Sequence, residues 1–131
     1  AGVILIASFK ESPELLRKSF EQAADQLKNG ELVCIFPEGW ITRDGNLQSF
    51  RPGVEKILRD TPVPVIPIAI RGMWGSWFSR ERGTAIQKWP RRFWSKVEVR
   101  IGEPLEPGST PVTAKELEGR VRELLTQPSS I

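Results

Sequence analysis

The sequence predicts an α/β domain in which a mainly parallel sheet is flanked by helices. Two continuous apolar runs, residues 3–7 and 32–36, indicate strands that are covered on both faces. A helical pattern separates them, and strand, helix and strand within about 35 residues form a βαβ unit with a right-handed crossover. The 131 residues suffice for one domain with a substantial core, so we treat 1–131 as a single domain.

The first helix has clear start and stop signals. Ser12 is a suitable N-cap, Pro13 fits the first turn, and Glu14 is favourable near the positive end of the helix dipole. Asn29 and Gly30 then predict its end. Its apolar residues recur at helical spacing: Leu16, Phe20, Ala23, Ala24 and Leu27.

The second half of the chain predicts two more strands. Pro52 opens a short helix over residues 53–58, and the apolar residues 63–70 follow. Because Pro64 and Pro67 cannot donate to a ladder, we expect this strand at an edge. In the next strand, residues 96–101, alternation predicts one inward and one outward set. The inward set is Val97, Val99 and Ile101, and the outward set is Lys96, Glu98 and Arg100.

The C-terminal part predicts a loop, a helix and a tail. Residues 104–111 are the loop, and Thr113 with Glu116 forms a capping box for the last helix. Residues 127–131 are expected to form a disordered tail. The apolar face of the helix consists of Leu117, Val121, Leu124 and Leu125.

Composition excludes several kinds of site. The chain has no histidine, so it contains no imidazole base, no Ser-His-Asp triad and no histidine metal site, and we expect no metal. Its one cysteine, Cys34, lies in an apolar run and is expected to be a buried hydrophobe in a reducing compartment. No apolar stretch approaches a membrane span. The start at Ala1, without methionine and close to an apolar run, suggests a fragment.

Residues 71–100 are strongly basic and rich in tryptophan. They contain eight basic and two acidic residues, a net charge of +6, whereas the whole chain carries only +3. Four of the five tryptophans lie here. Such a segment fits a bilayer interface with anionic lipid, a single-stranded nucleic acid, or a core aromatic cluster with a solvated basic rim. The residues expected to contact a membrane are Trp74, Trp77, Phe78 and Arg80.

The candidate functional site follows the apolar run at residues 32–36. Glu38 is the first charged residue after it, between Pro37 and Gly39. Ligands of open α/β sheets bind at the carboxyl ends of strands, so this carboxylate is either a ligand-binding group or an ordinary turn residue.

Two motifs in this region resemble sequence blocks of the glycerophospholipid acyltransferase family. Phe36-Pro37-Glu38-Gly39 with Arg51-Pro52-Gly53 resembles the third block, and the proline-bracketed residues 63–68 resemble the fourth. The resemblance covers residues 1–105. It implies the glycerol-3-phosphate acyltransferase fold in an N-terminally truncated form, and membrane surface rather than nucleic acid as the partner of residues 71–100.

The resemblance implies that the parent protein moves a fatty acyl chain from acyl-CoA or acyl carrier protein to a lysophospholipid, in phospholipid biosynthesis or remodelling and without a cofactor. The family's base is a histidine in an N-H-x-x-x-x-D block, expected upstream of Ala1. This chain would then hold no catalytic residue and be inactive alone. The implied location is the cytoplasmic face of the inner or plasma membrane, peripheral or tethered by missing segments. The resemblance is strongest to acyltransferase domains that are found alone or fused to lysophospholipid transporters and acyl-acyl-carrier-protein synthetases, so it implies that a domain of either kind can flank this one.

The resemblance also implies which residues bind substrate. Where the family's third block continues with Thr-Arg-Ser, this chain has Trp40, Ile41 and Thr42, so the usual phosphate-binding arginine is replaced by Ile41, and Arg43 or Arg51 could substitute. Loss of this arginine fits a lysophospholipid with a substituted headgroup. The expected substrate-binding residues are Glu38, Gly39, Thr42, Arg43, Arg51 and Arg71. The residues expected to shape the site are Phe36, Pro37, Pro64 and Pro67.

Two other functions remain compatible with the residues. One is a non-catalytic module that binds membrane or nucleic acid on the same fold. The other is an enzyme that binds a small phosphate compound through the Pro37-Glu38-Gly39 loop alone.

Overall fold

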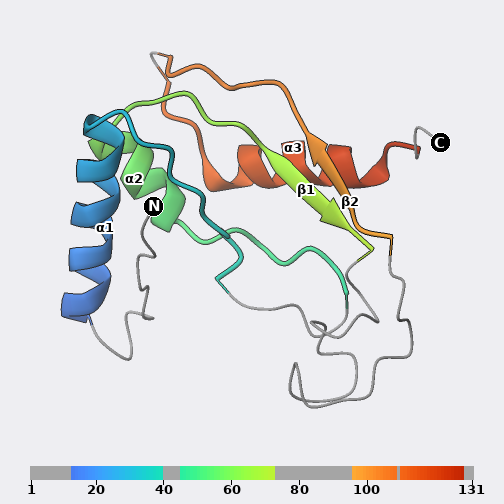
Figure 1. Cartoon of the computed structure of the whole chain (residues 1–131), viewed down its shortest axis with the longest axis horizontal. Helices are drawn as coiled ribbons and strands as arrows, with labels where there is room; N and C mark the ends of the chain where they lie inside the picture. The colour runs from blue at the N-terminus through green and yellow to red at the C-terminus, as the bar shows by residue number, and fades with distance from the viewer. Residues whose placement is uncertain (1–12, 40–44, 73–95, 109, 129–131) are drawn as a thin grey trace.

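The computed structural model describes residues 13–39, 45–72, 96–108 and 110–128 (Figure 1). Within these residues the elements are, in order, α1 (Pro13–Lys28), α2 (Gly53–Asp60), β1 (Ile68–Arg71), β2 (Glu98–Ile101) and α3 (Ala114–Thr126). Helix α3 packs on one face of the strand pair, while α1 and α2 lie together at the other end of the molecule (Figure 1).

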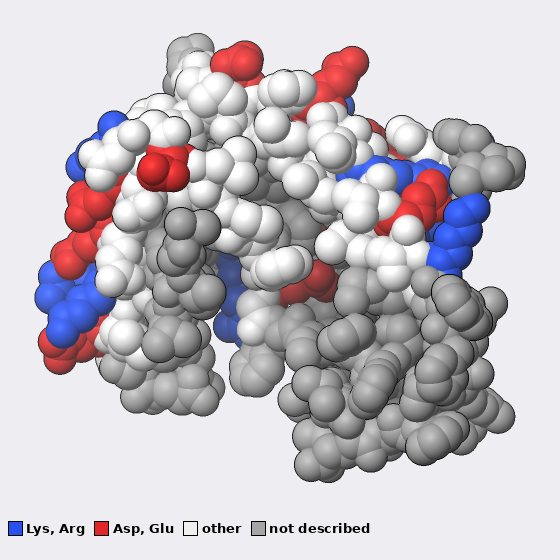
Figure 2. Space-filling view, in the orientation of Figure 1, with Lys and Arg blue, Asp and Glu red and all other residues white. Residues whose placement is uncertain are grey.

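Helix α1 confirms the sequence prediction for its described part. It begins at Pro13, and its end is closed by two backbone bonds, from Gly30 N to Leu27 O and from Glu31 N to Gln26 O. Acidic and basic side chains alternate along its outer face (Figure 2), where Arg17 pairs with Glu21. The expected cap, Ser12, lies outside the described residues.

Helix α2 is also confirmed and runs slightly further than predicted, to Asp60. Pro52 takes the N-cap position, where the missing N–H has no consequence for the helix ladder. Val54 and Ile57, three residues apart, are buried on one face of the helix.

The two strands form an antiparallel sheet in which Ile68 pairs with Ile101 and Ile70 with Val99. The expected strand over residues 63–70 therefore becomes regular only at Ile68. Before it, Val65 forms an isolated bridge with Leu105. Two residues lie between Val65 and Ile68, but three lie between Ile101 and Leu105, so the second strand carries one extra residue, as in a β-bulge.

The predicted parallel pairing is not part of the described structure, since residues 3–7 lie outside it. Residues 32–36 were predicted to form a buried strand, and the structure assigns them no strand. Leu32 is 87% exposed and Phe36 is 74% exposed. Cys34 is exposed as well, so the prediction of a buried cysteine is wrong. The reason is that no described strand pairs with this segment or covers it.

In strand β2 the inward and outward faces are the reverse of those predicted. Val99 and Ile101 are exposed, whereas the side chain of Arg100 is only 10% exposed. Val97, also predicted inward, is 50% exposed. The expected alternation is present, but α3 covers the face that carries Arg100, because the guanidinium reaches the carbonyl groups at the end of α3.

Helix α3 anchors the core and confirms its predicted cap and apolar face. The Thr113 side chain accepts the Glu116 N–H at 3.2 Å. Two hydrophobic clusters line the helix, one around Val54, Ala114 and Leu117, the other around Ala69, Val121 and Leu124. None of the helices in the described part of the chain is long and apolar enough to cross a membrane.

Both ends of α3 are held by side chains from other elements. At its start, the Glu55 carboxylate of α2 accepts the Ala114 N–H at 2.7 Å. At its end, Arg100 donates to Leu124 O, Gln127 O and Pro128 O. Because α3 has no basic residue in its last turn, this arginine supplies the cation that favours a helix C-terminus.

Candidate functional site

The turn at Pro37, Glu38 and Gly39 brings two of the predicted site residues against Arg51. Gly39 has φ +71° and donates its N–H to Phe36 O at 3.1 Å. A Cβ at Gly39 would lie 2.6 Å from Arg51 Nε. The backbone conformation therefore favours glycine here, and a Cβ would displace the Arg51 side chain from its place beside the turn.

Arg51 fastens the turn through its backbone and its side chain. Its N–H donates to Pro37 O at 2.8 Å, and its Nε donates to Glu38 O at 3.3 Å. The guanidinium is thereby held beside the turn although Arg51 is exposed as a residue. The structure thus brings together Glu38, Gly39 and Arg51, which lie up to 13 residues apart in the sequence.

The Glu38 carboxylate is bound through one of its two oxygens. Its Oε2 accepts the backbone N–H of Gln48 at 2.7 Å. Within the described part of the chain, Oε1 has no hydrogen-bond partner. A half-buried carboxylate with one committed oxygen and one available oxygen can accept a hydrogen bond from a ligand hydroxyl.

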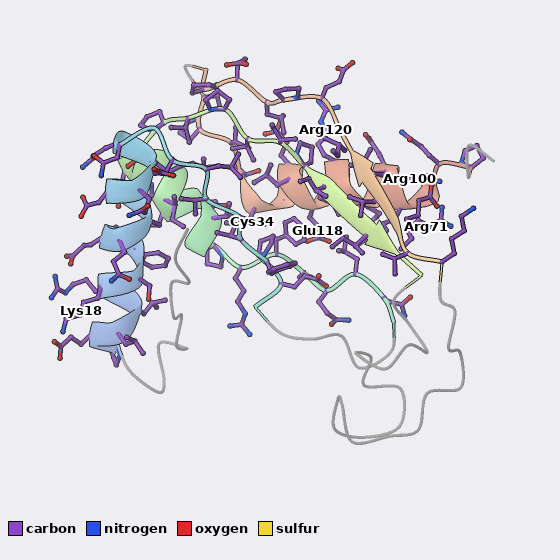
Figure 3. The ribbon with its side chains drawn as sticks, viewed as in Figure 1. Lys18, Cys34, Arg71, Arg100, Glu118 and Arg120 are labelled. Atoms are coloured by element: carbon purple, nitrogen blue, oxygen red, sulfur yellow. The ribbon has the colours of Figure 1, made fainter. Side chains whose placement is uncertain are left out.

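The same loop is bound to α3 at Phe50. Its N–H donates to Glu118 Oε2 at 3.2 Å, and its ring packs against both hydrophobic clusters. Glu118 Oε1 also accepts a hydrogen bond from Arg122 Nη2 at 2.8 Å. The Arg122 hydrogen bond, followed by the Phe50 N–H, lowers the pKa of Glu118 below its ordinary value of 4.5. Figure 3 shows Glu118 near the middle of α3.

Phe36 and Pro37 belong to this turn through their carbonyl groups, whereas Arg71 lies elsewhere in the described structure. Arg71 Nη1 donates to Gln127 O at 3.1 Å, at the far end of α3 beside Arg100 (Figure 3). Pro67 is buried and its carbonyl accepts the Gly102 N–H, while Pro64 is exposed. Six predicted residues lie outside the described residues: Thr42, Arg43, Trp74, Trp77, Phe78 and Arg80.

Sequence reasoning missed Gln48 and Glu118. Gln48 acts through its backbone N–H, which every residue except proline carries, so its identity gives no signal. Glu118 lies 68 residues from Phe50 and looks like any charged residue on the polar face of a helix. Only the folded chain brings these groups together.

The site therefore offers a fixed carboxylate, a nearby guanidinium and a glycine that permits close approach. These groups suit a ligand that combines a hydroxyl with an anionic group. Among the described residues, no group of three or more histidine, cysteine, aspartate or glutamate side chains could hold a metal ion.

Comparison with known proteins identifies the family. A family model described as Acyltransferase matches residues 2–71, more than half of the chain. A 1-acyl-sn-glycerol-3-phosphate acyltransferase of Pseudomonas aeruginosa is 31% identical over 121 residues, covering 88% of this chain and 42% of the relative. A Mycoplasma pneumoniae protein, named "Probable 1-acyl-sn-glycerol-3-phosphate acyltransferase", is 29% identical, covering 68% of this chain and 33% of the relative.

A solved structure agrees with these relatives. The crystal structure of the 1-acyl-sn-glycerophosphate (LPA) acyltransferase PlsC from Thermotoga maritima matches with a TM-score of 0.57 and 27% identity, covering 90% of this chain and 51% of that structure. The chain thus spans about half the length of this structure and less than half that of the two curated relatives. Because the family model matches residues 2–71, and this range contains both sequence motifs, the chain belongs to the Acyltransferase family.

Proposed function

We propose that this chain forms the acceptor-binding part of an enzyme that transfers a fatty acyl chain to a lysophospholipid. The names of the relatives from P. aeruginosa and T. maritima both specify acyl transfer to a 1-acylglycerophosphate, which supports an acceptor of this class. The proposed donor is a thioester, either acyl-CoA or acyl carrier protein, and no cofactor takes part.

The observation that carries the proposal is the arrangement of Glu38, Gly39 and Arg51. The available Oε1 of Glu38 would accept a hydrogen bond from a glycerol hydroxyl of the acceptor. Arg51, held over Gly39, would contribute positive charge for the acceptor phosphate. Gly39 leaves room for the Arg51 side chain to lie close to the backbone of the turn.

The reaction also needs a base that these 131 residues lack. The acceptor hydroxyl oxygen attacks the thioester carbonyl, a C–O bond forms, the C–S bond breaks, and the hydroxyl proton ends on the departing thiol. A base near neutral pKa must take that proton first, and the chain contains no histidine. We therefore expect the base to come from sequence outside these residues, and the chain alone to be inactive.

Residues 71–100 are proposed to hold the enzyme at the cytoplasmic face of a membrane. Their net charge of +6 and four tryptophans suit an anionic bilayer interface. Sedimentation with vesicles that contain about 30% anionic lipid tests this, since such binding should weaken as salt rises. Preference for an oligonucleotide over these vesicles would instead favour a nucleic-acid-binding module.

Glu38 variants of the 131-residue chain test the proposed site directly. Binding of glycerol 3-phosphate, followed by NMR titration, should weaken about tenfold or more in Glu38→Ala, since a charge-assisted hydrogen bond is lost. Glu38→Gln retains an acceptor for the Gln48 N–H and so separates the carboxylate's charge from its role in holding the loop. Glu31→Ala, an exposed glutamate seven residues earlier, is the matched control. Unchanged binding by Glu38→Ala would contradict the assignment.

A further inference from the structure

The segment from Gln48 to Arg51 is held between two carboxylates that belong to different parts of the chain. Glu38 Oε2 accepts the Gln48 N–H at 2.7 Å, and Glu118 Oε2 accepts the Phe50 N–H at 3.2 Å. In both cases an ionised acceptor binds a neutral backbone donor, which gives a stronger hydrogen bond than two neutral partners would. The segment is thus fixed at two alternate N–H groups.

The Glu118 contact lies directly beside the candidate site. Phe50 is covalently joined to Arg51, whose N–H bonds Pro37 O and whose Nε bonds Glu38 O. A shift of the Phe50 backbone would therefore move Arg51 relative to the turn. Because recognition sites need their groups held within about 0.5 Å of the productive geometry, such a shift would weaken ligand binding.

Glu118 itself is well placed to hold this position. It lies on α3, which is fastened at its start by Glu55 and at its end by Arg100, so the carboxylate stands on a rigid element. Its side chain is only 21% exposed, whereas its partner Arg122 is 57% exposed. The Phe50 ring adds a second attachment, since it packs against the apolar residues of the same helix.

We propose that Glu118 is a positioning residue, which sets the geometry of the acceptor-binding loop from the C-terminal helix by binding the Phe50 N–H. This inference rests on the proposed function for the identity of the ligand, but the loop geometry can be measured without any ligand. Helix α3 lies outside residues 2–71, which the family model matches. The proposed contact therefore comes from a part of the chain that the family model does not cover.

Three variants of the 131-residue chain test the proposal. Glu118→Ala removes the acceptor, Glu118→Gln keeps a neutral acceptor of the same length, and Glu123→Ala is the matched control. Glu123 lies on the same helix, and its side chain makes an exposed ion pair with Arg120. The readouts are amide hydrogen exchange at Gln48, Phe50 and Arg51 by NMR, and the affinity for glycerol 3-phosphate.

The expected pattern is specific to the loop. In Glu118→Ala, exchange at the three loop amides should rise about tenfold or more, while exchange in α1 stays as in the wild type. The affinity for glycerol 3-phosphate should fall about fivefold, and Glu118→Gln should recover most of both losses. Glu123→Ala should match the wild type.

Two results would overturn the proposal. One is loop exchange in Glu118→Ala that matches Glu123→Ala. The other is an equal rise in exchange across α1, α3 and the loop, because Glu118 would then stabilise the whole fold without setting the loop. If the wild-type chain fails to bind glycerol 3-phosphate, the proposed function of the loop fails, and amide exchange still decides whether Glu118 positions it.

Discussion

Replacing the strand residue Arg100 by alanine should strongly lower the free energy of unfolding of the protein. The side chain is 10% exposed, and its guanidinium bonds Leu124 O at 2.9 Å, Pro128 O at 3.0 Å and Gln127 O, while Nε bonds Glu98 Oε1 at 2.7 Å. One hydrogen bond to a charged group contributes about 1.5–3 kcal/mol. The contributions do not add fully, because the freed carbonyls regain water.

We therefore expect Arg100→Ala to lower the free energy of unfolding by about 3 kcal/mol, including about 0.5 kcal/mol from the lost cation at the end of α3. For a chain of this size, this corresponds to a fall in Tm of about 10 °C. Urea denaturation followed by circular dichroism measures the difference. Arg100→Lys should lie between alanine and wild type, since lysine keeps the charge but loses the planar fork.

The matched control is Arg120→Ala on α3, the helix that Arg100 holds, on the side away from Glu118 (Figure 3). Arg120 is 53% exposed, and its ion pair with Glu123 spans 4.0 Å. An exposed pair of this kind contributes about 0–1 kcal/mol. If Arg100→Ala and Arg120→Ala unfold at the same urea concentration, the reasoning that Arg100 anchors α3 is refuted.

Three further predictions concern the turn at Gly39, the loss of stability at low pH and the hydrophobic core. Gly39→Ala should reduce the free energy of unfolding by about 1–2 kcal/mol in urea denaturation, because φ is +71° at this residue. It should also weaken glycerol 3-phosphate binding, because the added Cβ would meet Arg51. Unchanged binding would contradict the described turn. Since the pKa of Glu118 is lowered by folding, its contribution to stability is present above pH 4.5 and is lost as pH falls through the folded pKa. The free energy of unfolding of Glu118→Gln should therefore fall less steeply in acid than that of the wild type. Parallel curves of unfolding free energy against pH would argue against this. Ala69→Leu should lower the free energy of unfolding by about 1–3 kcal/mol, as Ala69 is 1% exposed under α3; wild-type denaturation would mean that the cluster has room for the larger side chain.

The helices could be predicted because their signals are local. Pro13, the Asn29-Gly30 stop and the Thr113 cap lie within a few residues of the backbone groups that they affect. Strand orientation could not be predicted in this way. Alternation in residues 96–101 gives the period of a strand, but the face that α3 covers depends on a contact between Arg100 and residues 24–28 positions later.

The candidate site shows the same division between local and distant signals. Glu38, Gly39 and Arg51 were found because their motif resembles that of a family. Their hydrogen-bonded arrangement, and the parts played by Gln48 and Glu118, depend on backbone groups and on long sequence separations. For the apolar run at residues 32–36, the predicted partner strand, residues 3–7, lies outside the described residues, and no described strand pairs with the run.

The antiparallel pairing of β1 and β2 has a consequence for the segment that joins them. A Cβ at Gly72, where φ is +82°, would lie 2.1 Å from the Lys96 carbonyl oxygen, so the chain leaves and re-enters the described fold at one place. A side chain at position 72 would therefore have to push the Lys96 carbonyl away and open the strand pair at the end where Arg71 pairs with Glu98. The identity of residue 72 is thus tied to a backbone position 24 residues later in the sequence, and relatives that replace Gly72 should pair these two strands differently.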